Sequence, residues 1–207
     1  MDYINLSVRD FARSLADFST GPGGGSAAAV MGLLGISLLE MATGGETFAA
    51  HQQKITNGER MQLLPELRAL HQWLLRLVDQ DSAAFAAVLA AQEKMQTTPV
   101  EAELEEAVCG AIEVPLTIAS SCLQALQLAE KVVSTIAAPL VSEVSGAAAA
   151  LGAGIQGAAA SAYANLPLLT STEKRSIYET QILSLEASGK QLAEFLQKAC
   201  FIRLHEK

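Results

Sequence analysis

Helical spacing of apolar residues is the feature that most limits what this chain can fold into. Apolar side chains recur three and four residues apart in one segment after another, and no segment alternates β-branched with polar residues as a half-buried strand would. Glycine and proline separate the segments, at STGPGGG (19–25), at TGGE (43–46) and at Pro167. We therefore predict an all-α protein, an up-and-down type bundle of about six to seven helices that forms a single domain over residues 1–207.

The helix boundaries follow from local start and stop signals. Pro65 is placed where a first-turn proline is tolerated, and Thr98, Pro99 and Glu101 form a cap, a first helical residue and a capping-box partner. Pro115 predicts a kink. The expected helices cover 2–18, 26–42, 63–94, about 99–136 and 140–164, with a short piece at 47–57 and a last helix that starts at TSTEKR (170–175) and continues to residue 207.

Composition sets the kind of core and excludes one class of partner. Half of the residues are apolar but only 5% are aromatic, so we expect a core of small side chains that lets helix backbones approach closely. The net charge of −8 comes with no basic stripe, which argues against nucleic-acid binding. Three cysteines without CxxC spacing are typical of core residues in a reducing compartment, and they are Cys109, Cys122 and Cys200.

Neither a leader nor a membrane span is expected. The N-terminus MDYINLSVRDF lacks a basic region followed by an apolar one, so it is not a signal peptide. The uncharged run at 26–39 is too short to cross a bilayer. The longer uncharged run at 144–172 is mostly Ala, Gly and Ser and is broken by Pro167, which favours a buried helix over a membrane span.

The glycine-rich stretch GPGGGS (21–26) has two readings. It is not a Walker A loop, because no Lys-Ser or Lys-Thr follows the glycines, and it is not a dinucleotide fingerprint, because no strand precedes it. It is either a flexible turn between helices, or a loop that uses the free N–H groups of the next helix to hold a carboxylate or polarise a substrate oxygen. The residues alone leave both open.

Asp81 is the most unusual carboxylate of the chain. It lies on the apolar stripe of its helix, whereas Asp79 lies on the other side of that helix and reads as a solvated residue. A buried aspartate is costly unless it is paired or functional, so Asp81 either pairs with a neighbouring helix or takes part in chemistry. The stripe consists of Leu70, Trp73, Leu74, Leu77, Phe85, Val88 and Leu89.

Other polar candidates are weaker. Three glutamates in apolar surroundings read as structural partners, and these are Glu40, Glu113 and Glu143. The histidines share no i, i+4 spacing and no HExxH motif is present, so we expect no metal site; they are His51, His71 and His205. Ser26 has no histidine nearby in the sequence to activate it as a nucleophile.

Three collinear segments resemble one known family. PGGGSAAAVMGLLG (22–35), LVDQDSAAFAAVLAA (77–91) and AIEVPLTIASSCLQAL (111–126) are similar in order and spacing to signatures of the formiminotetrahydrofolate cyclodeaminase and methenyltetrahydrofolate cyclohydrolase family. The resemblance implies an all-helical, dimeric, cytoplasmic protein that binds a folate. The cyclodeaminase closes 5-formiminotetrahydrofolate to the 5,10-methenyl form with release of ammonia, and the cyclohydrolase hydrates the methenyl bridge.

The resemblance also implies which residues form the site. Asp79 and Asp81 correspond to the family's acidic pair, with Asp81 as the general acid, because the amidine must be protonated before ammonia can leave. Glu143 stands where the family has the aspartate of a Ser-Asp pair, and we include it among the catalytic candidates. The residues expected to bind the folate are Gly23, Gly24, Gly25, Ser26, Ser142 and Asn165.

The chain departs from the family pattern at three places. TGGETFAAHQQK (43–54) lacks the Lys-Lys pair of the family, Ser142-Glu143 replaces Ser-Asp, and SAYANL (161–166) keeps only Asn165 of an Asn-Val-x-x-Asn motif. The alternative to a folate enzyme is therefore a divergent, non-catalytic or repurposed protein on the same fold that binds another small molecule or a partner protein.

Overall fold

The chain forms an elongated bundle of helices, as predicted. The computed structural model describes residues 2–17, 21–44, 57–95, 101–134 and 136–205, with the backbone alone for 57–61, and this part contains helices and no strand. The helices are α1 (Val8–Ala16), α2 (Gly24–Gly44), α4 (Asn57–Met95), α5 (Glu101–Val132), α6 (Val141–Asn165) and α7 (Thr172–His205). Short 3-10 turns at Tyr3–Asn5, Ala138–Leu140 and Leu166–Leu168 join them.

Helices α2 and α6 form the centre of the bundle, where small residues bring the two backbones together. The pair runs antiparallel, since Gly24 lies beside Ser161 at one end and Gly146 lies beside Leu38 at the other. A Cβ added to Gly35 would lie 2.6 Å from Leu151 Cγ. The expectation of a core built from small side chains is confirmed here.

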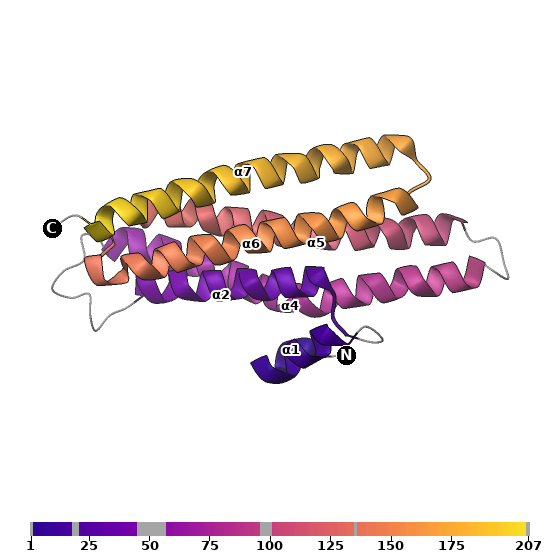
Figure 1. Ribbon diagram of the computed structural model, residues 1–207, viewed down its shortest axis with the longest axis horizontal. Helices are drawn as coiled ribbons and strands as arrows, with labels where there is room; N and C mark the ends of the chain where they lie inside the picture. Colours follow the sequence, from indigo (N-terminus) through magenta and orange to yellow (C-terminus); the bar gives the residue numbers. More distant parts are fainter. Residues whose placement is uncertain (1, 18–20, 45–56, 96–100, 135, 206–207) are drawn as a thin grey trace.

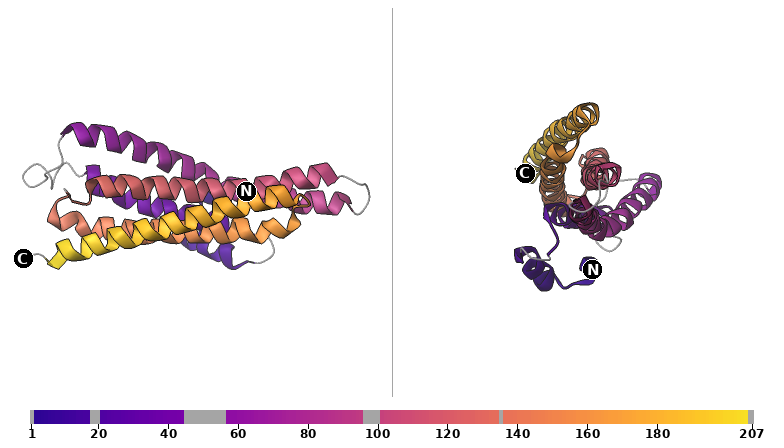
Figure 2. Two further views of the ribbon diagram at one scale, coloured as in Figure 1. Left: turned by 90° about the horizontal axis from the view of Figure 1, so that it is seen from above. Right: turned by 90° about the vertical axis from the view of Figure 1, so that its right-hand side faces the viewer.

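Helices α4, α5 and α7 pack around this central pair in chain order, each against the next along the sequence or against α6 (Figures 1 and 2). The apolar residues of α2, α4, α5 and α6 share one large core, which includes Ile36, Leu74 and Leu151. A second cluster, around Ile112 and Ile182, joins α5, α6 and α7.

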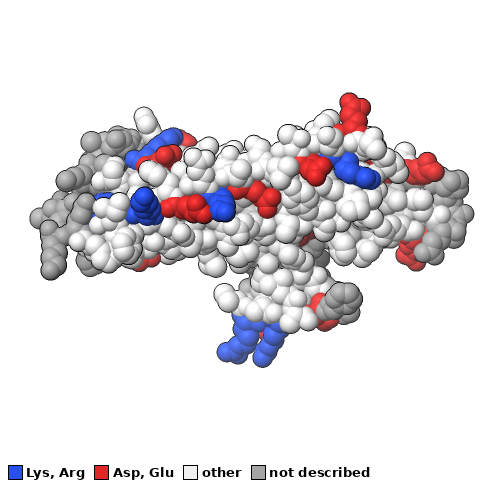
Figure 3. Space-filling model, turned by 45° about the horizontal axis from the view of Figure 1, so that its top comes forward, with Lys and Arg blue, Asp and Glu red and all other residues white. Residues whose placement is uncertain are grey.

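The N-terminal segment differs from the single helix predicted over 2–18. Tyr3–Asn5 forms a 3-10 turn, and α1 begins only after Ser7, whose Oγ accepts a hydrogen bond from the Asp10 N–H at 3.1 Å. Ser7 has extended backbone angles, as an N-cap requires, so it divides the segment. No residue of α1 is buried, and Figure 3 shows this helix as a projection standing off the bundle.

Most other boundaries agree with the predictions to within a few residues. Helix α4 begins earlier than expected, so Pro65 lies inside it rather than in its first turn. Helix α5 ends at Val132 rather than near Ile136, with Pro115 inside it. Ser171 caps α7 by accepting a hydrogen bond from the Lys174 N–H at 3.2 Å. The expected piece at 47–57 and the Thr98–Pro99 cap fall outside the described residues, apart from Asn57.

Within the described residues, three segments are long and apolar enough to cross a membrane, judged by length and composition alone. They are α2, α5 and the stretch Ala138–Leu168. Half of the most apolar window of α2, and half of that of α5, is buried inside the bundle. The absence of a membrane span stays a prediction.

Candidate functional site

The start of α2 is tied to α4 by one carboxylate. Ser26, fully buried in the first turn of α2, donates its N–H to Asp81 Oδ2 at 2.7 Å. Ser26 Oγ lies 3.1 Å from the same Oδ2, 2.8 Å from the Val78 carbonyl oxygen and 3.0 Å from Ser82 Oγ. The first N–H groups of a helix have no partner within it, so a carboxylate is stabilised here. The sequence-predicted Ser26 and Asp81 are thus brought together.

Gly25 leaves room for the second oxygen of Asp81. A Cβ added at Gly25 would lie 2.0 Å from Asp81 Oδ1, so any side chain at this position would displace the carboxylate. A Cβ at Gly24 would lie 3.2 Å from Ser161 Oγ, whereas one at Gly23 would meet nothing within 4 Å. Two of the three glycines therefore line a close junction of α2 with α4 and α6, and Gly23 lies at its open edge.

Burial favours the protonated form of Asp81. The pKa of Asp81 is raised above its ordinary value, because the loss of solvent outweighs the hydrogen bonds from the Ser26 hydroxyl and N–H, which act in the opposite direction. Oδ2 accepts those bonds, while Oδ1 has no hydrogen-bond partner among the described residues. Among the described residues, Oδ1 is therefore the oxygen of Asp81 that is left to bond to another group.

Asp79 has a structural task that the sequence did not indicate. Its Oδ1 accepts a hydrogen bond from the Tyr3 N–H at 2.6 Å, and Tyr3 itself is buried in the main core. Asp79 is thus half-buried and bonded, not the solvated residue its helix position predicted. The two aspartates bind the two ends of the N-terminal segment from Tyr3 to Ser26. Asp79 accepts a hydrogen bond from Tyr3, and Asp81 accepts one from Ser26.

Asn165 lies one helical turn beyond Ser161. Its Nδ2 donates to the Ala111 carbonyl oxygen at 3.2 Å and to the Ser161 carbonyl oxygen at 3.0 Å, which joins α6 to α5. The amide nitrogen is therefore engaged within the protein. Ser161, beside Gly24, was missed as a site residue, although it occupies the first asparagine position of the motif quoted above.

The structure does not bring Ser142 and Glu143 to Asp81. Both lie in the first turn of α6, and because α6 runs antiparallel to α2, that turn is at the opposite end of the pair from Gly24. Ser142 Oγ lies 3.5 Å from Glu143 Oε1, and both side chains lie near the surface. Nothing in the sequence indicated that Ser142 and Glu143 lie far from Asp81, because this depends on the direction in which α6 packs against α2.

The other glutamates named from the sequence are structural partners, as expected. Glu40 Oε1 lies 3.1 Å from His71 Nδ1, which joins α2 to α4. Glu113 accepts a hydrogen bond from the Tyr178 hydroxyl at 2.6 Å, which joins α5 to α7. Within the described part of the chain, no group of three His, Cys, Asp or Glu side chains is arranged to hold a metal ion.

Two of the surface cavities of the described bundle are lined by α5. A groove of about 890 Å³ is lined by α4, α5 and α7, including Trp73, Gln124 and Gln181. A second of about 650 Å³ is lined by α5 and α7, including Glu105, Cys109 and Lys174. Neither is lined by Asp81 or the three glycines.

The fold and the Asp81 site together define a class of protein. Its members are all-helical bundles in which an aspartate is bonded to the glycine-rich start of a central helix. The family described as Formiminotransferase-cyclodeaminase matches residues 7–183, and the chain belongs to this family.

Three comparisons show how far the likeness extends. Formimidoyltransferase-cyclodeaminase of Rattus norvegicus is 31% identical over 195 residues, which cover 92% of this chain but 36% of the rat protein. Methenyltetrahydrofolate cyclohydrolase of Methylorubrum extorquens is 28% identical over 187 residues, which cover 88% of both chains. The crystal structure of formiminotetrahydrofolate cyclodeaminase from Thermotoga maritima matches with a TM-score of 0.80 at 20% identity, over 97% of this chain and 96% of that one.

Proposed function

We propose that this chain is a folate-dependent one-carbon enzyme. It either cyclises 5-formiminotetrahydrofolate to 5,10-methenyltetrahydrofolate with release of ammonia or hydrolyses the methenyl compound. The observation that carries the proposal is the half-buried Asp81 carboxyl, held by Ser26 at the glycine-rich start of α2, with no described partner on Oδ1. The names of the rat and Methylorubrum relatives support the same two reactions.

Asp81 would act as a general acid. In the cyclisation, the amidine nitrogen must be protonated before ammonia leaves, and a raised pKa makes the Asp81 carboxyl a better proton carrier than an ordinary aspartate. The carboxylate that remains then stabilises the cationic methenyl bridge. The N–H groups at the start of α2 would bind an oxygen of the folate, and Ser161 lies beside that start, with Asn165 one turn further along α6.

Several further properties are part of this proposal. We infer that the protein acts as a homodimer in the cytoplasm, that it needs no metal, and that it binds neither nucleic acid nor a membrane. The net charge of −8 supports the absence of nucleic-acid binding, because phosphate backbones are bound through clustered basic residues.

A near-UV absorbance assay tests the activity, because the methenyl bridge is chromophoric. The purified chain is given 5-formiminotetrahydrofolate and, separately, 5,10-methenyltetrahydrofolate. Appearance of methenyl absorbance that is lost in Asp81→Asn identifies a cyclodeaminase, and decay of methenyl absorbance above the spontaneous rate identifies a cyclohydrolase. No change with either substrate would reject the proposal.

One observation favours a second candidate, a binding protein that has kept the fold without the reaction. The groove of about 890 Å³ between α4, α5 and α7 is not lined by Asp81, and its walls combine Trp73 with several uncharged polar side chains and Glu113. Calorimetric titration separates the two candidates. A folate that binds Asp81→Asn and wild type equally, without turnover by either, would support the binding protein.

A further inference from the structure

Cys109 differs from the other two cysteines in its surroundings. Cys122 and Cys200 are fully buried, and burial raises the pKa of the Cys122 thiol to about 12. Cys109 is half-buried on the wall of the cavity of about 650 Å³ between α5 and α7. The next residue, Gly110, has open space where a side chain would lie, so a small reagent can reach the sulfur from this cavity.

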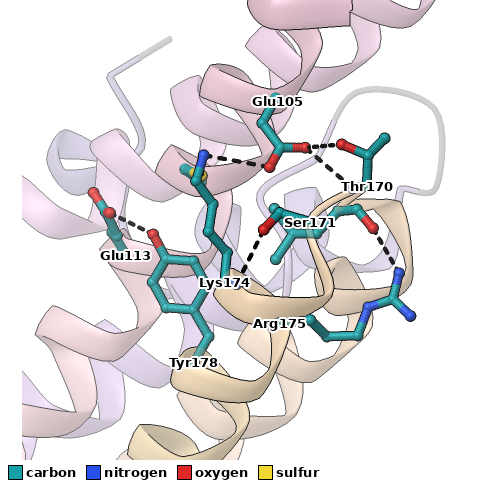
Figure 4. A network of polar contacts seen from close by, with 9 residues as sticks. Glu105, Glu113, Thr170, Ser171, Lys174, Arg175 and Tyr178 are labelled. Carbon is teal, nitrogen blue, oxygen red and sulfur yellow. Dashed lines mark hydrogen bonds and ion pairs between the residues drawn. The ribbon is translucent and has the colours of Figure 1, made fainter.

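Lys174 is held against this sulfur. Its Nζ donates a hydrogen bond to Cys109 Sγ at 3.8 Å and forms an ion pair with Glu105 Oε1 at 3.3 Å (Figure 4). The other oxygen of Glu105 is itself fixed, because it accepts hydrogen bonds from Thr170 N–H at 3.1 Å and Thr170 Oγ1 at 2.8 Å. The amine is therefore positioned by a carboxylate that the chain anchors at the start of α7.

Tyr178 flanks the same thiol from the next turn of α7. Its hydroxyl donates to Glu113, and burial together with Glu113 and Cys109 raises the Tyr178 pKa, so the phenol stays neutral. The neighbours that bear a charge or a proton are Glu105, Glu106 and Glu113 from α5, and Lys174 and Tyr178 from α7. Lys174 is the only amine among the residues that line this cavity.

We propose that Cys109 and Lys174 are a modification site at which a peroxide produces a covalent sulfur–nitrogen bond between α5 and α7. Hydrogen peroxide first oxidises the thiol to a sulfenic acid, and one peroxide oxygen leaves as water. Lys174 Nζ then attacks Sγ, an S–N bond forms, the S–O bond breaks and a second water leaves. The sulfur is oxidised by two electrons, the peroxide is reduced by two, and the product is a sulfenamide.

Lys174 must lose a proton before it can attack. Its ion pair with Glu105 and the neighbouring Cys109 raise the Lys174 pKa, so the neutral amine is scarce at neutral pH. Hydroxide from solvent accepts this proton, because the hydrogen bonds from Thr170 lower the pKa of Glu105 and make it a weak base. We therefore expect the cross-link to form faster at alkaline pH than at neutral pH.

The test is mass spectrometry of the intact folded protein after exposure to hydrogen peroxide. The expected product weighs less than the reduced chain by two hydrogen atoms, gives a peptide pair that joins Cys109 to Lys174 after digestion, and returns to the starting mass with dithiothreitol. Cys109 oxidised to sulfenic or sulfinic acid without a cross-linked peptide would overturn the proposal. So would a linked product that carries an additional oxygen atom.

Three variants make the result specific. Cys109→Ala and Lys174→Arg should both abolish the cross-link, and the arginine keeps a cation beside Glu105, so loss of the ion pair cannot explain its effect. Lys190→Gln removes an exposed lysine elsewhere on α7 and should leave the yield unchanged. Because the readout is a mass rather than turnover, it is independent of the proposed folate activity. A cross-link that persists in Lys174→Arg would overturn the assignment of the nitrogen.

Discussion

At the scale of single residues, Asp81 combines a cost in stability with a candidate role in chemistry. Its side chain is half-buried and its pKa is raised by the loss of solvent, yet only one oxygen is held, by Ser26, and the other has no partner among the described residues. A residue kept only for stability would be fully bonded or replaced by a neutral side chain. This pattern is typical of functional sites, where a group destabilises the fold in return for reactivity.

Asp81→Asn should stabilise the protein at neutral pH. A raised folded-state pKa means that the native state binds a proton more tightly than the unfolded chain, so stability falls as pH rises from the ordinary value of 3.8 through the folded value. Each pKa unit corresponds to about 1.4 kcal/mol. Thermal unfolding should therefore show a higher Tm for the variant at neutral pH and no difference below the ordinary pKa. A lower Tm at neutral pH would contradict the raised pKa.

Gly25→Ala should damage the site, and Gly23→Ala should not. The alanine Cβ at position 25 would lie 2.0 Å from Asp81 Oδ1, so the carboxylate must leave Ser26, whereas the Cβ at position 23 meets nothing within 4 Å. We expect a loss of about 1–3 kcal/mol for Gly25→Ala from overpacking. Urea unfolding measures both variants. Equal midpoints for Gly25→Ala and wild type would show that the carboxylate is not fixed there.

Residue-level predictions succeeded where a local rule applied. Asp81 could be singled out because a charge on an apolar stripe needs a partner or a purpose, and its junction with Ser26 agrees with that rule. Asp79 could not be interpreted correctly, because its partner Tyr3 lies at the other end of the N-terminal segment. The expected contribution of Glu143 to the Asp81 site depended on the packing direction of α6, which no local pattern encodes.

At the scale of elements, the bundle depends on how closely α2 approaches α6. Residues that face each other across this pair are mainly Gly and Ala, which explains why a chain with few aromatic residues can still form a dense core. The sequence predicted these two helices well, because glycine and proline mark where the helices end. It could not predict that they are partners, since 96 residues lie between Gly44 and Val141.

Gly35→Ala should weaken this pair. Its Cβ would lie 2.6 Å from Leu151 Cγ and 3.1 Å from the Ala147 carbonyl oxygen, and the backbone atom cannot move aside. Overpacking of this kind costs about 1–3 kcal/mol. The matched control is Gly110→Ala on α5, where the space is open, and we expect it to stabilise by about 0.5–1 kcal/mol through helix propensity. Denaturant unfolding of both variants tests this prediction. Gly35→Ala must lower the free energy of unfolding, and Gly110→Ala must raise it.

Arg203 holds the end of α7 to the end of α5. Its two terminal nitrogens donate to the Val133 and Ile136 carbonyl oxygens, both at 2.6 Å, beyond the last residue of α5. Charge-assisted bonds of this kind contribute about 1.5–3 kcal/mol, so Arg203→Gln should lower the free energy of unfolding by that amount. Arg203→Lys, which can reach one carbonyl at a time, should lose less. Hydrogen exchange at the C-terminal turns of α7 gives an independent local readout.

At the scale of the whole molecule, the surface has many apolar side chains for a chain of this size. Leu34 on α2, Phe85 on α4 and Leu183 on α7 are each more than half exposed. The projecting α1 adds Val8, the most exposed of the large apolar residues. Large apolar area at a surface marks contact with another protein or with lipid, and single exposed residues alone do not. Three of the described segments also have the length and hydropathy to span a bilayer. An experiment must therefore separate contact with another protein from contact with lipid.

We expect the chain to purify without detergent and to sediment as one species of twice its 21.7 kDa mass. The physical reason is that half of the apolar windows of α2 and α5 is already buried within the bundle, and a second copy of the chain would cover apolar side chains that stay exposed. Sedimentation velocity over a range of concentrations measures this directly. Dissociation on dilution would give the dimer affinity. A monomer at every concentration would reject the homodimer, and aggregation that only detergent relieves would favour the membrane instead.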